Sequence, residues 1–180
     1  MNRRTFVQRA TAGAMALSLP AMPAFFKDLR MGVVVHSYAA RWNPKAESQR
    51  YPGFAHAVDL IEHCGRIGAG GVQVGVKDWT ADFARKVRDR REKLGLYLEG
   101  SIGLPQKAED VPAFEGEVKN AREAGAQILR TVCSSGRRYE TYTSQAAFQA
   151  FTKNALASLQ LAEPVLRNYK VKLAVENHKD

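Results

Sequence analysis

Cysteine is scarce in this 180-residue sequence, and the two cysteines present argue against a zinc site with cysteine ligands. Cys64 and Cys133 belong to no CxxC pair and to no other spacing typical of zinc ligands. Cys64 falls within a helical pattern and Cys133 at the end of an expected strand, so we expect both to act as small buried apolar residues. A disulfide between them would suit an oxidising compartment, but nothing in the sequence requires one.

Three further signatures of common protein classes are missing. The sequence has no run of Lys and Arg interleaved with aromatic residues, which argues against a nucleic-acid partner. The N-terminal apolar stretch is too short, and too rich in Ala, Gly and Pro, to span a membrane comfortably. No GxGxxG motif follows the first expected strand, which weakens a dinucleotide-binding function. With 45% hydrophobic and 25% charged residues, the sequence predicts a soluble domain with a packed core.

Acidic residues are absent from the first 25 positions, which contain Arg3, Arg4 and Arg9. A charged start followed by a short apolar stretch is typical of a signal peptide, and the paired arginines in "NRRTFVQ" resemble a twin-arginine (Tat) signal. Asn2 stands where that signal usually has Ser or Thr. We predict a signal peptide over residues 1–26, recognised by the Tat export machinery, and therefore a periplasmic or otherwise exported protein. A plain amphipathic arm is the alternative.

Positive charge outnumbers negative charge, with a formal net charge of +9. Three of the surplus charges belong to the predicted signal peptide, so the rest of the chain carries a surplus of six. Such a surplus favours anionic small molecules as ligands, and it is equally typical of a solvated surface.

Strand-like and helix-like patterns alternate along the remaining sequence. Short runs rich in β-branched residues predict strands over 31–37, 71–76, 96–102, 127–134 and 171–178. Helical spacing of apolar residues predicts helices over 54–69, 80–95, 110–126 and 144–170. We expect Thr80 and Asp110 to cap two of these helices, and Pro164 to kink or split the last one. The alternation predicts a parallel sheet, either a (β/α)8 TIM barrel or an open doubly wound sheet.

Polar side chains gather where the expected strands end, which is where parallel α/β proteins bind ligands. Alternation along each strand predicts that His36, Glu99, Arg130 and Glu176 face the inside of the sheet. A buried carboxylate without a partner is costly, so Glu176 must meet a cation. That cation is a metal ion or a basic side chain such as Arg130.

Five short motifs together resemble a known family. In order they are "MGVVVHSY", "GGVQVGV", "YLEGSI", "SSGRRYE" and "LAVENHKD". They resemble the sugar phosphate isomerase/epimerase family of xylose isomerase-like TIM barrels, and most closely its exported members with a Tat signal. The resemblance covers residues 27–180. It implies the N-terminal part of such a barrel, truncated after about five strands.

The resemblance also implies a chemistry. In that family a divalent metal ion is held by residues from the ends of strands five to eight, and the first ligand corresponds to Glu176. Mn²⁺, Mg²⁺, Co²⁺ or Zn²⁺ would suit such ligands. Glu176 would also act as a catalytic acid/base in proton transfer next to a sugar carbonyl. The other ligands would lie beyond residue 180, so we expect this chain alone to be inactive.

Other expectations concern the substrate and the alternatives. The implied partner is a small carbohydrate, and a homo-oligomer is compatible with the sequence. A lyase or hydrolase acting on keto-sugars or inositol derivatives is one alternative, because this barrel supports several reactions. An exported sugar-binding protein without catalysis is another. Trp79 would stack on a sugar ring or anchor its loop. The residues expected to contact substrate are His36, Glu99, Arg130, Asn177 and His178.

Overall fold

The computed structural model describes residues 31–42, 48–133 and 138–176. The predicted signal peptide at residues 1–26, and the predicted substrate contacts Asn177 and His178, lie outside these ranges. None of the helices in the described ranges is long and apolar enough to cross a membrane.

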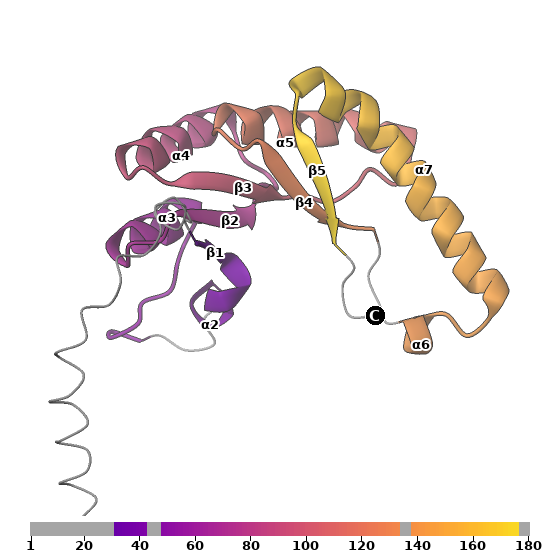
Figure 1. The fold of residues 1–180 in the computed structure, drawn as a ribbon, viewed down its shortest axis with the longest axis horizontal. Coiled ribbons are helices and arrows are strands. Elements are labelled where there is room, and N and C mark those ends of the chain that lie inside the picture. Colours follow the sequence, from indigo (N-terminus) through magenta and orange to yellow (C-terminus); the bar gives the residue numbers. More distant parts are fainter. Residues whose placement is uncertain (1–30, 43–47, 134–137, 177–180) are drawn as a thin grey trace, which may run out of the picture. The chain divides into compact units, whose positions relative to one another are not determined.

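Five parallel strands form one sheet, in the same order as in the sequence (Figure 1). A doubly wound sheet reverses its strand order at a switch point, whereas a TIM barrel adds each strand next to the previous one. The observed order therefore confirms the barrel type and excludes the doubly wound alternative. The strands are β1 (Gly32–Val34), β2 (Gly71–Gly75), β3 (Tyr97–Ser101), β4 (Ile128–Val132) and β5 (Lys172–Glu176).

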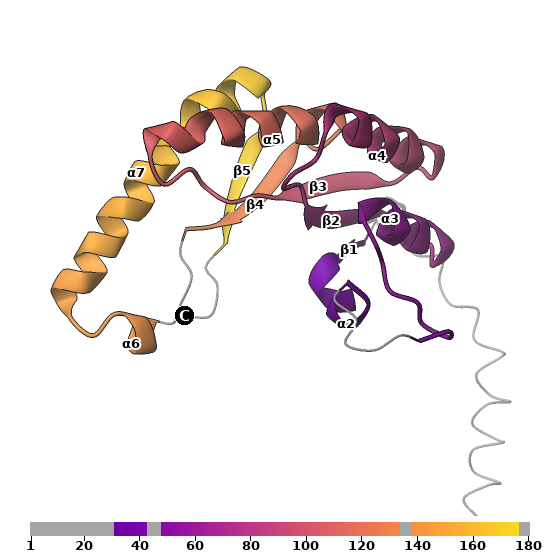
Figure 2. The same ribbon diagram turned by 180° about the vertical axis from the view of Figure 1, so that it is seen from behind.

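The predicted helices are all present and connect the strands, as Figure 2 shows from behind. Their apolar faces pack against one face of the sheet. In the resulting core Val72, Leu98 and Leu129 are buried against helical residues such as Leu60 and Val118. Each such aliphatic side chain contributes about 1.5–3 kcal/mol when fully buried. The four helices are α3 (Ala57–Arg66), α4 (Ala81–Lys93), α5 (Val111–Glu123) and α7 (Gln145–Tyr169).

The two predicted helix caps have different outcomes. The Thr80 hydroxyl accepts a hydrogen bond from the Phe83 amide at 3.1 Å, which confirms it as the N-cap of α4. The Asp110 carboxylate instead accepts from the amides of Gln106 and Lys107, at 3.0 and 3.2 Å. It therefore caps the short 3-10 helix η3 (Ala108–Asp110), and its side chain makes no capping bond to α5.

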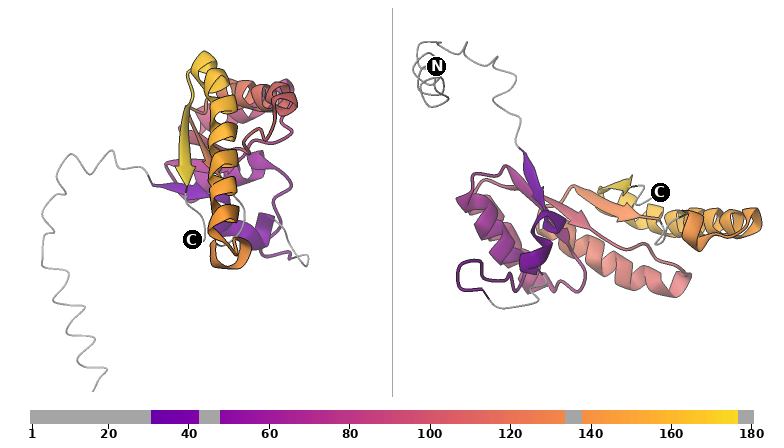
Figure 3. Two further views of the ribbon diagram at one scale, coloured as in Figure 1. Left: turned by 90° about the vertical axis from the view of Figure 1, so that its right-hand side faces the viewer. Right: turned by 90° about the horizontal axis from the view of Figure 1, so that it is seen from below.

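The sequence predicted that Pro164 would kink or split the last helix, and the split does not occur. Helix α7 is continuous from Gln145 to Tyr169 with Pro164 inside it (Figure 3). Proline removes one backbone donor, which leaves the carbonyl of Gln160 without its helical partner. Gln160 is exposed, so water can solvate that carbonyl. Ala162 and Val165 are buried on either side of the proline, and their packing keeps the helix intact.

Some short elements were not predicted from the sequence. Strand β1 ends at Val34, and the chain then forms the 3-10 helix η2 (Val35–Tyr38) and the one-turn helix α2 (Ala39–Trp42). Another one-turn helix, α6 (Arg138–Thr141), precedes α7. Both cysteines are free thiols, Cys64 buried and Cys133 half-buried, and burial raises the pKa of each.

Tyr97 lies across the inner face at the N-terminal end of the sheet. A Cβ atom at Gly71 would overlap its ring, and one at Gly32 would overlap its hydroxyl end. Burial and the nearby Glu99 charge raise the pKa of Tyr97. Glycine at these two positions therefore makes room for an aromatic ring on the inside of the sheet.

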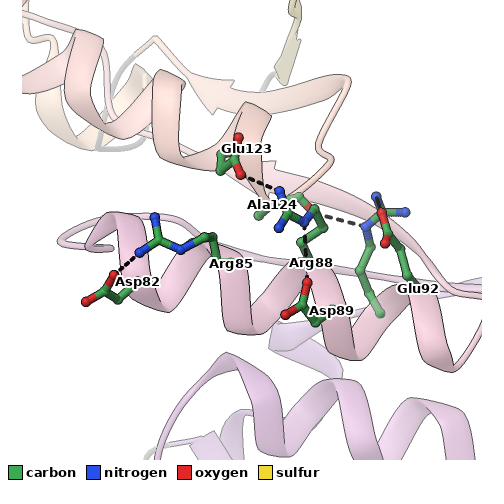
Figure 4. Close-up of polar contacts among 8 residues, drawn as sticks. Asp82, Arg85, Arg88, Asp89, Glu92, Glu123 and Ala124 are labelled. Carbon is green, nitrogen blue, oxygen red and sulfur yellow. Dashed lines mark hydrogen bonds and ion pairs between the residues drawn. The ribbon is translucent and has the colours of Figure 1, made fainter.

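Helices α4 and α5 are joined by polar contacts as well as by the core (Figure 4). Arg88 of α4 forms an ion pair with Glu123 of α5. Arg91 Nε donates to the carbonyl oxygen of Ala124, at the C-terminal end of α5, over 2.9 Å. Because the last carbonyls of a helix have no partner within it, this contact satisfies one of them.

Candidate functional site

Polar side chains on the inner face form contacts between neighbouring strands. Gln73 on β2 and Glu99 on β3 are partners in the parallel register. Gln73 Nε2 donates to Glu99 Oε2 over 3.1 Å. The amide therefore fixes the direction in which the Glu99 carboxylate points.

Arg130 of β4 links the two strands beside it. Its Nη1 donates to Ser101 Oγ on β3 over 3.4 Å, and its Nε forms an ion pair with Glu176 at the end of β5. The Arg130 side chain is 14% exposed and that of Glu176 is 46% exposed. Strand alternation correctly placed Arg130 and Glu176 on one face, because they contact each other.

The sequence left open which cation Glu176 would meet, and the structure pairs it with Arg130. The expectation that the Glu176 carboxylate is buried is wrong. Val175, beside it on β5, is 52% exposed as well. Both exposures arise because β5 is the last strand of the sheet among the described residues, so one of its edges has no neighbouring strand there.

A cavity of about 280 Å³ opens beside this row of polar residues, at the C-terminal ends of the first three strands. Gln73 and Ser101 contribute to both the row and the cavity wall. The cavity is lined by Val35, His36, Ala39, Trp42, Gln73, Gly75 and Ser101.

His36 lines this cavity, but not from a strand as predicted. It lies in η2, after β1 has ended, and it is exposed. Alternation along a strand therefore does not determine its direction. The residue remains a candidate substrate contact, because the turn carries it to the cavity wall.

The two tryptophans have different roles in the structure. Trp79 makes an edge-to-face contact with Phe83, with ring centroids 5.5 Å apart, and its carbonyl accepts from Asn120 Nδ2. Trp79 is thus a loop anchor, the second of the two expected roles. Trp42 lines the cavity and was missed. Its spacing of four residues from Tyr38 was a helical signal, in a segment for which no element was predicted.

A larger, more open cavity of about 780 Å³ lies between the end of β4, the loop after β3 and the first half of α7. Aromatic residues dominate one side of it. Tyr142 and Phe151 both line the cavity, and their rings stack with centroids 4.9 Å apart. Its polar lining residues include Gln106, Thr141 and Asn154, and none of its lining residues is charged, in contrast to the inner face.

The ligands for a metal ion are incomplete in the described ranges. No group of three His, Cys, Asp or Glu side chains within those ranges could hold a metal ion. Glu176 is an oxygen donor of the right type, but a guanidinium group lies against it. These residues by themselves do not fit a bound divalent ion.

Comparisons with known proteins agree on the fold. No family model and no curated protein matches the chain. Among solved structures, D-psicose 3-epimerase in the presence of D-fructose is 14% identical, with a TM-score of 0.60 over 83% of this chain and 55% of that one. D-Psicose 3-epimerase with D-tagatose, from Clostridium cellulolyticum H10, is 10% identical, with a TM-score of 0.59 over 82% and 52%.

L-Ribulose 3-epimerase is 17% identical, with a TM-score of 0.55 over 81% of this chain and 48% of that one. The chain thus spans about half the length of the solved structures it matches. At such low identities the likeness establishes the fold alone. The described residues form five parallel strands, with their connecting helices, in the arrangement of a TIM barrel.

Proposed function

We propose that this chain is part of a sugar epimerase- or isomerase-like enzyme that transfers a proton at the carbon next to a sugar carbonyl. One observation carries the proposal. Three successive strands place charged groups on the inner face of the sheet, beside a cavity. These groups are the hydrogen-bonded carboxylate of Glu99, the guanidinium of Arg130 and the carboxylate of Glu176. This is the end of the barrel at which TIM-barrel enzymes bind their substrates.

The proposed step uses Glu176 as the base. Its carboxylate takes the proton from the carbon next to the carbonyl, and the electrons of the broken C–H bond form an enediolate. Return of a proton to the opposite face of that carbon gives the epimer, whereas protonation at the neighbouring carbon gives the isomer. Arg130 and Ser101 are donors placed to bind substrate oxygens as negative charge develops on them.

The cavity is proposed to hold the sugar. Trp42 supplies an aromatic face, and His36, Gln73 and Ser101 supply hydrogen-bonding groups. A few polar groups within a partly apolar wall are typical of small-molecule sites. Glu99, oriented by Gln73, is a further candidate contact, and Asn177 and His178 stay proposed contacts that lie outside the described ranges.

A divalent metal ion belongs to the proposal as the cofactor implied by the family resemblance. Such an ion would polarise the carbonyl oxygen when bound. Glu176 is the proposed ligand from this chain. Further ligands would have to come from outside the described residues, because those residues form no complete set.

The test is deuterium incorporation from heavy water into D-fructose and D-psicose, followed by proton NMR in the presence of Mg²⁺. The protein is expressed from its complete reading frame, and Glu176→Gln is the comparison. Loss of the C3 proton signal with wild type, but not with Glu176→Gln, is the expected result. Equal exchange by both proteins would contradict the role of Glu176.

One second candidate is an exported sugar-binding protein without catalysis, which the cavity supports through the aromatic face of Trp42 and its hydrogen-bonding side chains. The same NMR samples separate the two candidates. Saturation transfer to the sugar without deuterium exchange would support binding alone, whereas exchange supports the enzyme.

A further inference from the structure

The turn formed by η2 and α2 has two sides with different surroundings. On the other side from the cavity, Tyr38 and Arg41 contact α3 and the segment that precedes it. Whatever holds that side therefore also determines where the turn presents its groups to the cavity. The residues of the turn that line the cavity are Val35, His36, Ala39 and Trp42.

Arg41 joins the turn to the segment before α3 through its backbone and its side chain. Its carbonyl oxygen accepts from the Phe54 amide over 2.8 Å, and its Nε donates to the carbonyl oxygen of Pro52 over 2.9 Å. The guanidinium also lies over the Phe54 ring, 4.0 Å from its centroid. Phe54 belongs to the buried core, so Arg41 fastens the turn to a fixed part of the molecule.

His63 extends this attachment to α3. Arg41 Nη1 donates to His63 Nδ1 over 3.4 Å, and the Tyr38 ring packs edge-to-face on the same imidazole. The bond from Arg41 requires the neutral imidazole. A protonated ring has a donor in place of the acceptor at Nδ1, and its charge repels the guanidinium.

The groups around His63 favour the neutral ring at neutral pH. Burial lowers the pKa of His63, and the charges of Arg41 and Arg66 lower it further. From the neighbouring α4, Arg90 is ion-paired with Glu62 of α3. Arg41 therefore keeps its acceptor at neutral pH and loses it as the pH falls through the folded pKa of His63.

We propose that Arg41, together with its acceptor His63, positions the turn so that His36 and Trp42 keep their places in the cavity wall. Arg41 is a positioning residue, because it acts on the cavity through the residues that line it. The consequence for sugar binding rests on the proposed function, in which this cavity holds the sugar. Release of the turn loosens one wall of the cavity and weakens sugar binding.

Acrylamide quenching of Trp42 fluorescence tests the positioning role without a ligand. The chain has two tryptophans, so Trp79→Phe leaves Trp42 as the only one, and every protein in the series carries this change. Arg41→Ala is expected to raise the quenching constant about twofold, because the turn loses the contacts that hold it. An unchanged quenching constant in folded Arg41→Ala would overturn the proposal.

Arg50→Ala is the matched control for Arg41→Ala. The Arg50 guanidinium also lies over an aromatic ring in the segment before α3, 5.2 Å from the centroid of Tyr51. That ring is exposed and belongs to the next residue in the chain, so the substitution should leave the quenching of Trp42 unchanged. An equal rise in Arg50→Ala would overturn the proposal, since loss of a positive charge would then explain both results.

Two substitutions of His63 keep the proposal testable if Arg41→Ala does not fold, as judged by circular dichroism. His63→Gln retains an acceptor for Arg41 and His63→Leu removes it, so quenching should rise only in His63→Leu. With His63 present, quenching should also rise between pH 7.5 and pH 5.5, and His63→Gln should remove that rise. Equal quenching in the two His63 variants at both pH values would contradict the proposal.

Isothermal titration calorimetry with D-psicose and the full chain measures the effect on binding. Arg41→Ala and His63→Leu should bind D-psicose about tenfold more weakly than wild type, because binding must then order the cavity wall. Increased quenching with unchanged sugar affinity would overturn the link between the turn and the sugar. Increased quenching with no D-psicose binding by any protein, wild type included, would contradict the proposed function and support the positioning role alone.

Discussion

At the scale of single residues, the face of the sheet on which a strand residue lies was predictable from the sequence, whereas the residue that its side chain contacts was not. A period of two residues was enough to place Glu99, Arg130 and Glu176 on the inner face. This period could not predict which cation pairs with Glu176, because the pairing depends on the register between strands and on the side-chain rotamers. His36 marks the limit of the rule, since its backbone is no longer extended.

His63 of α3 is half-buried among aromatic rings and next to an arginine. Tyr38 and Phe54 contact its ring, with centroids 4.7 and 5.6 Å away. Arg41 Nη1 lies 3.4 Å from His63 Nδ1. A guanidinium group only donates, so Nδ1 must accept and the proton of the neutral ring must be on Nε2. Nε2 is buried and has no hydrogen-bond partner within the described residues.

The environment of His63 predicts a loss of stability in mild acid. Burial lowers the pKa of His63, and the charges of Arg41 and Arg66 lower it further. Below the unfolded pKa, about 6.5, the unfolded chain takes up a proton that the folded chain resists. The free energy of unfolding therefore falls as pH drops through this range, and it levels off below the folded pKa.

Urea unfolding at pH 7.5 and pH 5.5 tests this prediction. The change in unfolding free energy between the two pH values should be smaller in His63→Gln, which keeps an acceptor for Arg41 but does not titrate. An identical pH dependence in wild type and His63→Gln would show that other groups cause it.

Gly71 is expected to be intolerant of any side chain. In Gly71→Ala the new methyl group would overlap the Tyr97 ring, and forced repacking of this kind costs about 1–3 kcal/mol. Thermal unfolding measures the loss. In Gly71→Ala/Tyr97→Ala the overlap is absent, so the double variant should lose less stability than the two single changes combined.

Gly116→Ala on α5 is the matched control for Gly71→Ala. No atom lies within 4 Å of the added methyl group, and alanine favours a helix over glycine by about 0.5–1 kcal/mol. A rise in stability is expected there. Destabilisation by both substitutions would mean that the effect at Gly71 is not specific to Tyr97.

At the scale of elements, the type and order of the strands and helices were predictable from the sequence, because apolar residues recur with a different period in strands and in helices. All five strands and the four long helices form within a few residues of their predicted ends. The helix ends and the turns were harder, because they depend on contacts made elsewhere. Asp110 caps η3 rather than α5, and packing of Ala162 and Val165 carries α7 through Pro164.

Arg91 is expected to matter more to the α4–α5 contact than its surface neighbours. Its side chain is 20% exposed, and it donates to the carbonyl of the fully buried Ala124. Arg91→Ala leaves that carbonyl unpaired, which costs about 1–3 kcal/mol. Arg85→Ala removes a more exposed ion pair with Asp82, which is worth about 0–1 kcal/mol.

Urea unfolding of the two arginine variants provides the comparison. The structure predicts a larger loss for Arg91→Ala than for Arg85→Ala, although both remove one positive charge from the same helix. Losses of equal size would indicate that charge on α4, and not the bond to Ala124, supports this contact.

At the scale of the whole molecule, the two outer strands of the sheet are the edges at which the described residues could pair with another chain. The strand order leaves β1 and β5 each with one edge that has no strand neighbour within the described residues. A sheet edge offers unpaired amides and carbonyls to other chains. Exposed apolar side chains lie on β5 and on α7, at Val175 and Leu156, which are 52% and 56% exposed.

Association of chains through the β5 edge is the expected consequence, and Val175→Lys should reduce it. A lysine on an edge strand opposes pairing with a second strand through its charge and its hydration. Val175 is half-exposed, so the unfolding free energy should change by only about 0.5 kcal/mol. Static light scattering over a concentration series should show the variant staying monomeric at concentrations where wild type associates. Leu156→Lys removes a similar apolar side chain from a helix, so an equal effect there would mean that apolar surface, not the strand edge, drives association.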